Sequence, residues 1–212
     1  MSDEREESTV PDAAREEVVQ SVMRALAAHG YAGLTTKRVA AESEKSEAFF
    51  FYHYDTKEDL IVAFLEWAVD RLSNQVAGAE DADPVTRLYE ACDVLLGDSS
   101  DDVDRGINVA MMELLSHAPH NERFHERLTA YERRVVDDLA AIIEDGIDAG
   151  VFRDVDPEST AAYLLMTADG TAGAVMALGM ADVEVMVRDR LFDYVGTTVL
   201  AEGVEAPPEW TL

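Results

Sequence analysis

The sequence predicts an all-α protein of about nine helices. Three observations support this fold class. Apolar residues recur every three or four positions along most of the chain, and capping residues, prolines and glycines mark the ends of these segments. No segment shows the alternating pattern of a β-strand, and no internal repeat is visible.

The first two helices follow from the residues at their ends. An amphipathic helix is expected over residues 12–29, and Gly30 ends it. Thr35 can cap a second helix, in which the apolar residues Val39 and Ala40 face inward.

A third helix is expected to begin at Ser46, which can cap it, and it places Phe50 and Tyr54 one turn apart on the inner side. The break over residues 41–45 is long enough only for a tight turn. This is the spacing of a helix-turn-helix, in which the second helix of the pair enters the DNA major groove.

Six further helices are expected in the rest of the chain. Thr56 caps the first of them, Asp83 precedes a helix with Pro84 in its first turn, Asn121 caps the longest, and Gly150 ends it. The expected ranges are 56–79, 84–96, 102–116, 121–149, 157–179 and 183–201. The final residues, APPEWTL, are expected to be disordered or loosely packed.

The charge distribution is uneven. The formal net charge is -27, from 17 Lys and Arg against 44 Asp and Glu, yet residues 12–60 carry six basic and nine acidic residues, a net -3 that leaves -24 for the rest. All three lysines, Lys37, Lys45 and Lys57, lie in this N-terminal part. The acidic residues are thus displaced from the candidate DNA-binding face, which argues against the alternative that an acidic surface there mimics nucleic acid.

The composition as a whole resembles that of proteins from halophilic organisms. Asp and Glu are equally frequent, and lysine is rare compared with arginine. In molar salt the Debye length is about 3 Å, so repulsion between an acidic protein and DNA is largely screened.

The stretch from Thr35 to Leu60, TTKRVAAESEKSEAFFFYHYDTKEDL, resembles the DNA-binding domain of the TetR/AcrR family of one-component transcriptional regulators. The matching features are a Thr-led helix ending in Val39-Ala40, Ser46 at the start of a recognition helix, the aromatic run after it, and the closing T-K-E-x-L. The resemblance is specific over about residues 13–65 and architectural beyond.

The resemblance implies a TetR-like domain organisation. We expect a disordered acidic N-terminus at 1–11, a helix-turn-helix domain at 12–55, a ligand-binding and dimerisation domain at 56–201, and a C-terminal tail at 202–212. A ligand-free dimer would occupy a pseudo-palindromic operator, and a small molecule would release it.

The resemblance also implies which residues contact a double-stranded DNA operator. Hydroxyl groups, helix N-termini and lysines suit phosphates, and short side chains at the front of the recognition helix let it approach base edges. The expected contacts are Thr35, Thr36, Lys45, Ser46, Glu47, Ala48, Phe51, Tyr52, His53 and Lys57.

Two of these positions depart from the family pattern. Glu47 stands where many relatives carry a basic or small residue, and Phe51 replaces a tyrosine whose hydroxyl commonly contacts a phosphate. A carboxylate at the front of a recognition helix can accept a hydrogen bond from cytosine N4, but it also repels the DNA backbone. An interaction or sensor protein with the same fold and weak or lost DNA binding therefore stays an alternative.

A homodimer is implied through the last two long helices, where glycines would allow close approach. The alternative for the same apolar stripes is an ordinary core within one chain. The expected interface residues are Ala161, Leu165, Ala168, Ala172, Met176, Leu191, Tyr194, Val195 and Thr198.

A pocket for a small-molecule effector, apolar or cationic, is implied inside the C-terminal bundle. Met and aromatic side chains adapt to irregular ligands, although residues at such helical spacing are more often simply core. The expected lining is Phe64, Trp67, Tyr89, Cys92, Met111, Met112, Leu115, Tyr163, Met166 and Thr167.

Other functions have little support in the sequence. The chain has no Gly-rich phosphate loop, no nucleophile elbow and no Cys/His pair at a plausible spacing, so we expect neither an enzyme nor a cofactor. A metal site near His117, His120 and His125 is conceivable, but a solvated turn is favoured there. The single cysteine, Cys92, excludes an internal disulfide and is expected to be a small buried apolar residue.

Localisation follows from two further features. No run of eighteen apolar residues is present, and the N-terminal MSDEREESTVPD has neither the basic start nor the apolar stretch of a signal peptide. We therefore expect a cytoplasmic protein that does not enter a membrane.

Overall fold

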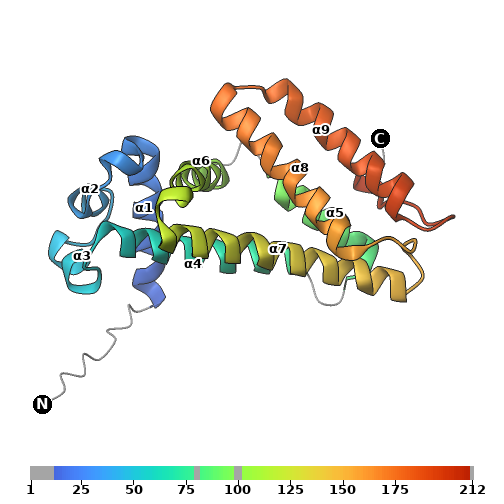
Figure 1. The fold of residues 1–212 in the computed structure, drawn as a ribbon, viewed down its shortest axis with the longest axis horizontal. Coiled ribbons are helices and arrows are strands. Elements are labelled where there is room, and N and C mark those ends of the chain that lie inside the picture. Colours follow the sequence, from blue (N-terminus) through green and yellow to red (C-terminus); the bar gives the residue numbers. More distant parts are fainter. Residues whose placement is uncertain (1–11, 79–81, 98–101, 211–212) are drawn as a thin grey trace, which may run out of the picture. The chain divides into compact units, whose positions relative to one another are not determined.

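The structure is a computed structural model that describes residues 12–78, 82–97 and 102–210 (Figure 1). Within these ranges it consists of nine α-helices and contains no strand, only an isolated antiparallel bridge between Phe152 and Leu200. The all-α prediction is confirmed, whereas the N-terminus predicted at 1–11 lies outside the described ranges. The helices are α1 Asp12–Gly33, α2 Thr36–Ala41, α3 Glu47–His53, α4 Lys57–Ala77, α5 Pro84–Leu96, α6 Asp102–His117, α7 Glu122–Asp148, α8 Pro157–Leu178 and α9 Ala181–Tyr194.

The predicted capping residues lie at their helix starts. Thr35 Oγ1 accepts a hydrogen bond from the Arg38 amide at 3.2 Å, and Ser46 Oγ accepts one from the Phe49 amide at 3.3 Å. Gly30 interrupts α1 with a φ of 64°, a conformation that favours glycine. Thr56, Asp83, Asn121 and Asp156 accept from backbone amides in the first turns of α4, α5, α7 and α8.

The chain divides into two compact units. The first contains the residues up to Ala68 together with Val109–Leu128, and the second contains Val69–Asn108 and the residues from Thr129 onward. The division differs from the predicted border at residue 56, because the corner between α6 and α7 belongs with the N-terminal helices. We call the two parts the N-terminal unit and the bundle unit.

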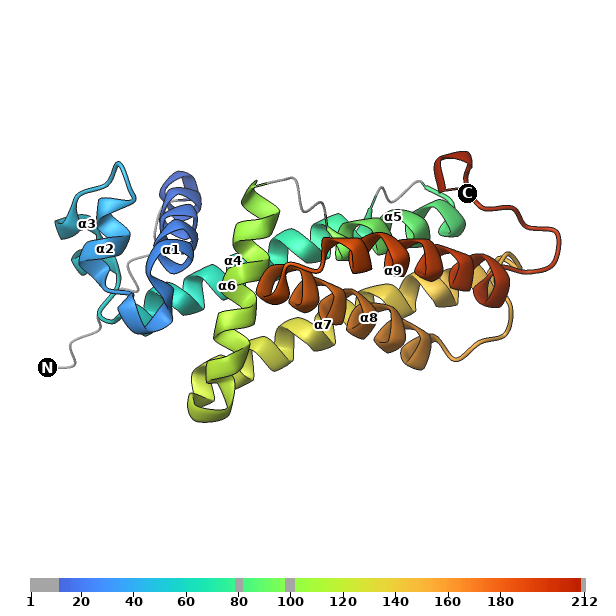
Figure 2. The same ribbon diagram turned by 90° about the horizontal axis from the view of Figure 1, so that it is seen from above.

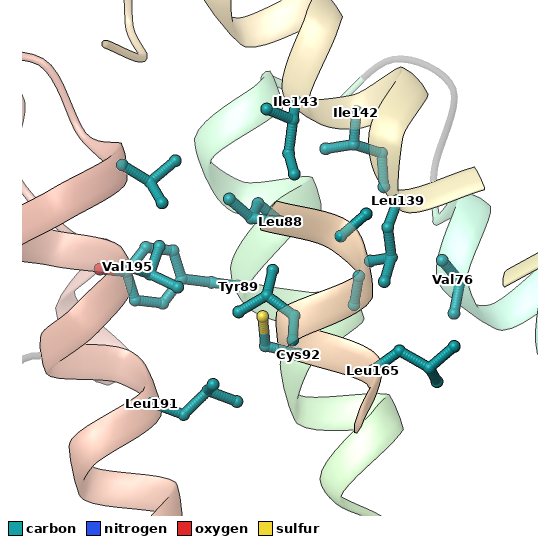
Figure 3. Packing of buried hydrophobic residues seen from close by; sticks show 14 of the residues in the cluster. Val76, Leu88, Tyr89, Cys92, Leu139, Ile142, Ile143, Leu165, Leu191 and Val195 are labelled. Atoms are coloured by element: carbon teal, nitrogen blue, oxygen red, sulfur yellow. The ribbon is translucent and has the colours of Figure 1, made fainter. Parts of the chain in front are cut away.

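Four helices and the end of α4 enclose the core of the bundle unit. Figure 3 shows side chains converging from α5, α7, α8 and α9, among them Cys92, Ile142, Leu165 and Leu191. Each fully buried aliphatic side chain of this size contributes about 1.5–3 kcal/mol of transfer free energy. Cys92 is a free buried thiol, as predicted, and its burial raises its pKa to about 12.

The C-terminal segment is packed rather than loose. Pro208–Trp210 form a short 3₁₀ turn, and the Trp210 ring centre lies 5.8 Å from that of Tyr89 and 6.4 Å from that of Phe192. The prediction of a loose tail was therefore wrong as far as residue 210, because a large aromatic ring adds to the apolar core. The last long helix also ends earlier than predicted, with a wider π-helical turn over Val195–Val199.

Helices α8 and α9 lie side by side in both views (Figures 1 and 2). Among the helices of the described part, α8 is long and apolar enough to cross a membrane by length and composition. Only 28% of its most apolar window is buried within the chain. The core of the chain covers one side of such a helix. A helix that is apolar on most sides needs a partner to cover its remaining apolar surface as well.

Candidate nucleic-acid interface

The aromatic run of α3 is divided between an inner and an outer side. Phe50 is fully buried and Tyr54 is buried, whereas Phe51 and Tyr52 are 58% and 74% exposed. The prediction that Phe50 and Tyr54 belong to the domain core is confirmed. A helix of only seven residues is thus anchored by one ring and presents two others to solvent.

The polar groups predicted to contact DNA lie at the surface of the N-terminal unit. The Lys45 ammonium lies 5.9 Å from the centre of the Phe49 ring, next to the exposed first turn of α3. Among the predicted contacts, Thr35, Lys45, Ser46, Glu47, Ala48, Phe51 and Tyr52 are exposed, and Thr36, His53 and Lys57 are partly buried.

Helix α1 holds the turn that precedes α3. Glu17 Oε1 accepts hydrogen bonds from Ser43 Oγ at 2.9 Å and from the Glu44 amide at 3.0 Å. The bonds from the Glu44 amide and the Ser43 hydroxyl keep the pKa of the Glu17 carboxyl below its usual value. The carboxylate therefore stays charged at neutral pH and restrains the turn.

A second contact from α1 fixes the same turn one residue earlier. The carbonyl oxygen of Glu42 accepts from Arg24 Nη2 at 2.6 Å and from the buried Ser21 hydroxyl at 3.3 Å. We call Glu17, Ser21 and Arg24 the turn bracket. The sequence pattern did not predict these contacts, because the partners lie 18 to 27 positions away along the chain.

Lys57 has a different environment from Lys45. Its ammonium donates to the carbonyl oxygen of Tyr31 at 3.3 Å and lies 4.1 Å from the centre of the Tyr31 ring. The side chain is partly buried at the start of α4.

Of the three histidines considered for a metal site, His117 packs against Tyr31, next to Glu113, and the other two face solvent. Glu113 Oε1 accepts from the Tyr31 amide at 2.5 Å, and the His117 ring centre lies 4.5 Å from that of Tyr31. His120 and His125 are exposed. Among the described residues, no group of three or more His, Cys, Asp or Glu is placed to hold a metal ion.

The predicted pocket residues are divided between the two units. Phe64, Trp67, Met111, Met112 and Leu115 belong to the N-terminal unit, and Tyr89, Cys92, Tyr163, Met166 and Thr167 belong to the bundle unit. Tyr89 and Cys92 are core residues, but Tyr163 and Met166 on α8 are 50% and 53% exposed, and Leu115 is also exposed. Tyr163 and Met166 therefore do not line the interior of the bundle unit.

The predicted dimer residues differ in how far their own chain buries them. Most of them face the core of their own chain, because α8 is apolar on several sides and periodicity alone does not identify the inner one. Ala161, Leu165, Ala168, Leu191 and Val195 are buried, Ala172, Met176 and Tyr194 are partly buried, and Thr198 is exposed.

The outward side of α8 carries a different set of residues. Tyr163 and Met166 are exposed there, and no atom outside the helix backbone lies within 4 Å of a Cβ built on Gly170 or Gly173. We call these four residues the open α8 face.

Two carboxyl groups meet between α7 and α8. Burial raises the pKa of Glu132 to about 7, helped by the charge of Asp169 and a hydrogen bond to it, and burial raises the pKa of Asp169 to about 6. Glu132 Oε2 is buried without a hydrogen-bond partner. One proton is thus best shared by the pair near neutral pH.

The fold and the α2-turn-α3 geometry define a helix-turn-helix regulator with a separate helical bundle. Comparisons with known proteins agree. Residues 20–64 match the model of the tetR family of bacterial regulatory proteins, and residues 84–197 match that of the C-terminal domain of BetI-type transcriptional repressors. These matches cover more than half of the chain, which belongs to the TetR family of transcriptional regulators.

Solved structures show the same fold. A TetR transcription regulator from Haloarcula marismortui is 34% identical with a TM-score of 0.77, over 89% of this chain and 100% of that one. A transcriptional regulator from Saccharomonospora viridis, in complex with choline, is 23% identical with a TM-score of 0.77, over 91% and 100% of the two chains.

Curated relatives match about a third of the chain. The HTH-type transcriptional repressor AcnR of Corynebacterium glutamicum is 31% identical over 67 residues, which are 32% of this chain and 36% of the repressor. The AcnR of Corynebacterium diphtheriae is 33% identical over 63 residues. The chain thus spans about a third of the length of the curated relatives that it matches.

Proposed function

We propose that the protein is a cytoplasmic, dimeric repressor that binds a pseudo-palindromic DNA operator and releases it when a small molecule binds to the bundle. The observation that carries the proposal is the presentation of α3. Its front is exposed and polar, its inner ring Phe50 is buried, and the turn bracket holds the turn before it. An element of this kind can insert into the major groove as a rigid unit.

The open α8 face supports a dimer. It combines two exposed apolar side chains, Tyr163 and Met166, with two glycines that leave space for another helix. A second copy related by a twofold axis would cover this face on both chains at once. In such a dimer two recognition helices lie about 34 Å apart and contact successive major grooves.

A small cation is the effector class that we propose. The regulator crystallised with choline has the same fold, and the bundle unit holds the carboxyl groups of Glu132 and Asp169 close to the Tyr131 ring. Carboxylates and aromatic faces are the groups that bind quaternary ammonium ions. Choline added to the protein should weaken DNA binding in the wild type and do so less in Glu132→Gln.

The acidic surface is proposed to suit a salt-rich cytoplasm. The N-terminal unit keeps its three lysines on a background of net charge -3 over residues 12–60, while most of the acid lies elsewhere. Because few phosphates are neutralised, the loss of affinity with rising salt should be shallow.

DNase protection on the DNA upstream of its own coding region tests the proposal. Two protected half-sites with dyad symmetry are expected. No protection at any salt concentration would contradict the repressor and favour the second candidate, a TetR-fold interaction protein. That alternative rests on Glu47, whose exposed carboxylate in the first turn of α3 repels DNA phosphates.

A further inference from the structure

We infer that Glu47 determines part of the operator sequence: its carboxylate accepts a hydrogen bond from the N4 amino group of a cytosine in each half-site. The inference rests on the proposed DNA binding by a dimer and adds to it a base that each recognition helix selects. Its physical basis is the chemistry of the side chains that α3 presents to solvent.

Four side chains of α3 are exposed, and they differ in what they can offer to a base. Ala48 and Phe51 carry no hydrogen-bonding group, so they can make only apolar contacts. The hydrogen-bonding groups are the carboxylate of Glu47 and the hydroxyl of Tyr52. Glu47 lies in the first turn of α3, and the N-terminal residues of a recognition helix are those that contact base edges.

The Glu47 carboxylate is available for such a contact. Among the described residues it forms no hydrogen bond and no ion pair, in contrast to Glu17, whose carboxylate accepts from Ser43 and from the Glu44 amide. The backbone that carries Glu47 is nevertheless held in place, because the turn bracket fixes the turn before α3 and the buried Phe50 ring anchors the helix. An acceptor with a fixed origin and no partner suits a base edge.

The donors and acceptors of the major groove decide which base fits. Cytosine presents its N4 amino donor, whereas guanine presents two acceptors and thymine presents one. Adenine has an amino donor as well, but its N7 acceptor lies beside it and repels a carboxylate. Cytosine is therefore the base from which Glu47 can accept a hydrogen bond without facing an acceptor of the same base.

Two other effects of this carboxylate do not depend on the base. It repels the DNA phosphates, which weakens binding to every sequence, and an acidic residue in the first turn interacts favourably with the helix dipole. Neither effect distinguishes one base pair from another. Base preference is therefore the readout that separates a specificity-determining residue from a merely repulsive or stabilising one.

The test is a selection of duplexes from a randomised pool by the full-length protein at high salt. In the duplexes bound by the wild type, we expect one position in each half-site to be cytosine. Replacing that cytosine by thymine, with adenine opposite, should weaken wild-type binding about tenfold, because an acceptor takes the place of the donor.

Two variants at the same position sharpen the test. Glu47→Ala should bind the cytosine and thymine duplexes within about twofold of each other, because the discriminating acceptor is gone. Glu47→Gln should select adenine at this position, since a side-chain amide pairs with N6 and N7 of adenine.

Glu44→Ala is the matched control, because it removes an exposed acidic side chain three positions earlier, in the turn before α3. It changes the net charge by the same amount, so it should alter the affinity for both duplexes by one common factor and leave the preference for cytosine unchanged.

Two results would overturn the inference: a preference for cytosine that persists in Glu47→Ala, or a wild type whose selected duplexes have no base preference that depends on residue 47. In either case the protein still binds DNA and the proposed function stands. If the wild type selects no duplex at any salt concentration, the proposed function fails and the inference fails with it.

Discussion

The two units of the chain are organised by different interactions. In the N-terminal unit, short polar contacts between distant segments fix a turn and a helix start, as Glu17 does with Ser43 and Lys57 does with Tyr31. In the bundle unit an aliphatic core joins the long helices, and the ion pair between Arg188 and Asp93 lies at its margin. Hydrogen bonds are directional, so they can fix the orientation of a short helix such as α3. An apolar core holds long helices together on one side and leaves their other side available to a partner.

The largest expected effect is the difference in stability between variants of the two neighbouring rings Phe50 and Phe51. Phe50→Ala removes a fully buried ring and should lower the free energy of unfolding by about 3–5 kcal/mol. Phe51→Ala removes an exposed ring and should change it by less than about 0.5 kcal/mol. Urea unfolding measures both, and a similar loss for the two variants would refute the division of the aromatic run.

The open α8 face can be tested by adding a charge where space is available. Gly170→Glu fits within one chain, since nothing lies within 4 Å of a Cβ there, but it would bury a carboxylate in a dimer. We expect the dimer dissociation constant to rise at least about 100-fold, as for a central interface residue. Light scattering at high salt gives the mass.

The matched control for this variant is Ala141→Glu, at an exposed position of α7 in the same unit, which should remain dimeric. A monomeric wild type, or a dimeric Gly170→Glu, would show that the open α8 face is not the interface.

A smaller effect is expected from the turn bracket. Glu17→Ala removes the acceptor for Ser43 and the Glu44 amide and should weaken operator binding about tenfold, because the orientation of α3 is no longer fixed. Its neighbour Glu16 is exposed and, within the part of the chain that the structure describes, accepts from Gln20, so Glu16→Ala is the control and should stay within about twofold. Affinity is measured by titrating labelled operator. If Glu17→Ala and Glu16→Ala changed the affinity equally, the cause would be the lost charge and not the released turn.

The smallest effect concerns pH and the bundle unit. The pKa values of Glu132 and Asp169 are raised to about 7 and 6, so the folded chain keeps protons that the unfolded chain releases near pH 4. This contribution to stability is complete below about pH 4 and is lost as the pH rises to about 7. Glu132→Gln should therefore show a smaller fall in melting temperature between about pH 5 and 8 than the wild type.

Glu144→Gln, which changes an exposed residue of α7, should follow the wild type through the same pH range. If Glu132→Gln also followed the wild type, the carboxyl pair would not hold a shared proton.

The difference between local and distant contacts also explains what the sequence could predict. Caps such as Thr35 and Ser46 act within three residues, and the spacing of Phe50 and Tyr54 is a property of one helix, so α2 and α3 could be predicted from local pattern. The same spacing predicts that Phe51 and Tyr52 lie on the outer side of α3, as the structure shows.

The rest depended on contacts that no local pattern contains. The turn bracket joins residues more than fifteen positions apart, and the Trp210 contact with Tyr89 joins residues 121 positions apart. On α8 the apolar residues occupy several sides, so periodicity did not show that Leu165 faces inward and Met166 outward. Which of the predicted dimer residues meet a partner therefore stays a prediction.

Guanine N7 methylation interference on the protected DNA tests the central claim most directly, because it reports contacts in the major groove. If α3 enters the groove from each subunit of a dimer, methylation should block binding at two clusters about one helical turn apart, and Tyr52→Ala should weaken binding to the unmethylated duplex. Binding that is indifferent to N7 methylation in both half-sites, or unaffected by the loss of Tyr52, would contradict a recognition helix at α3.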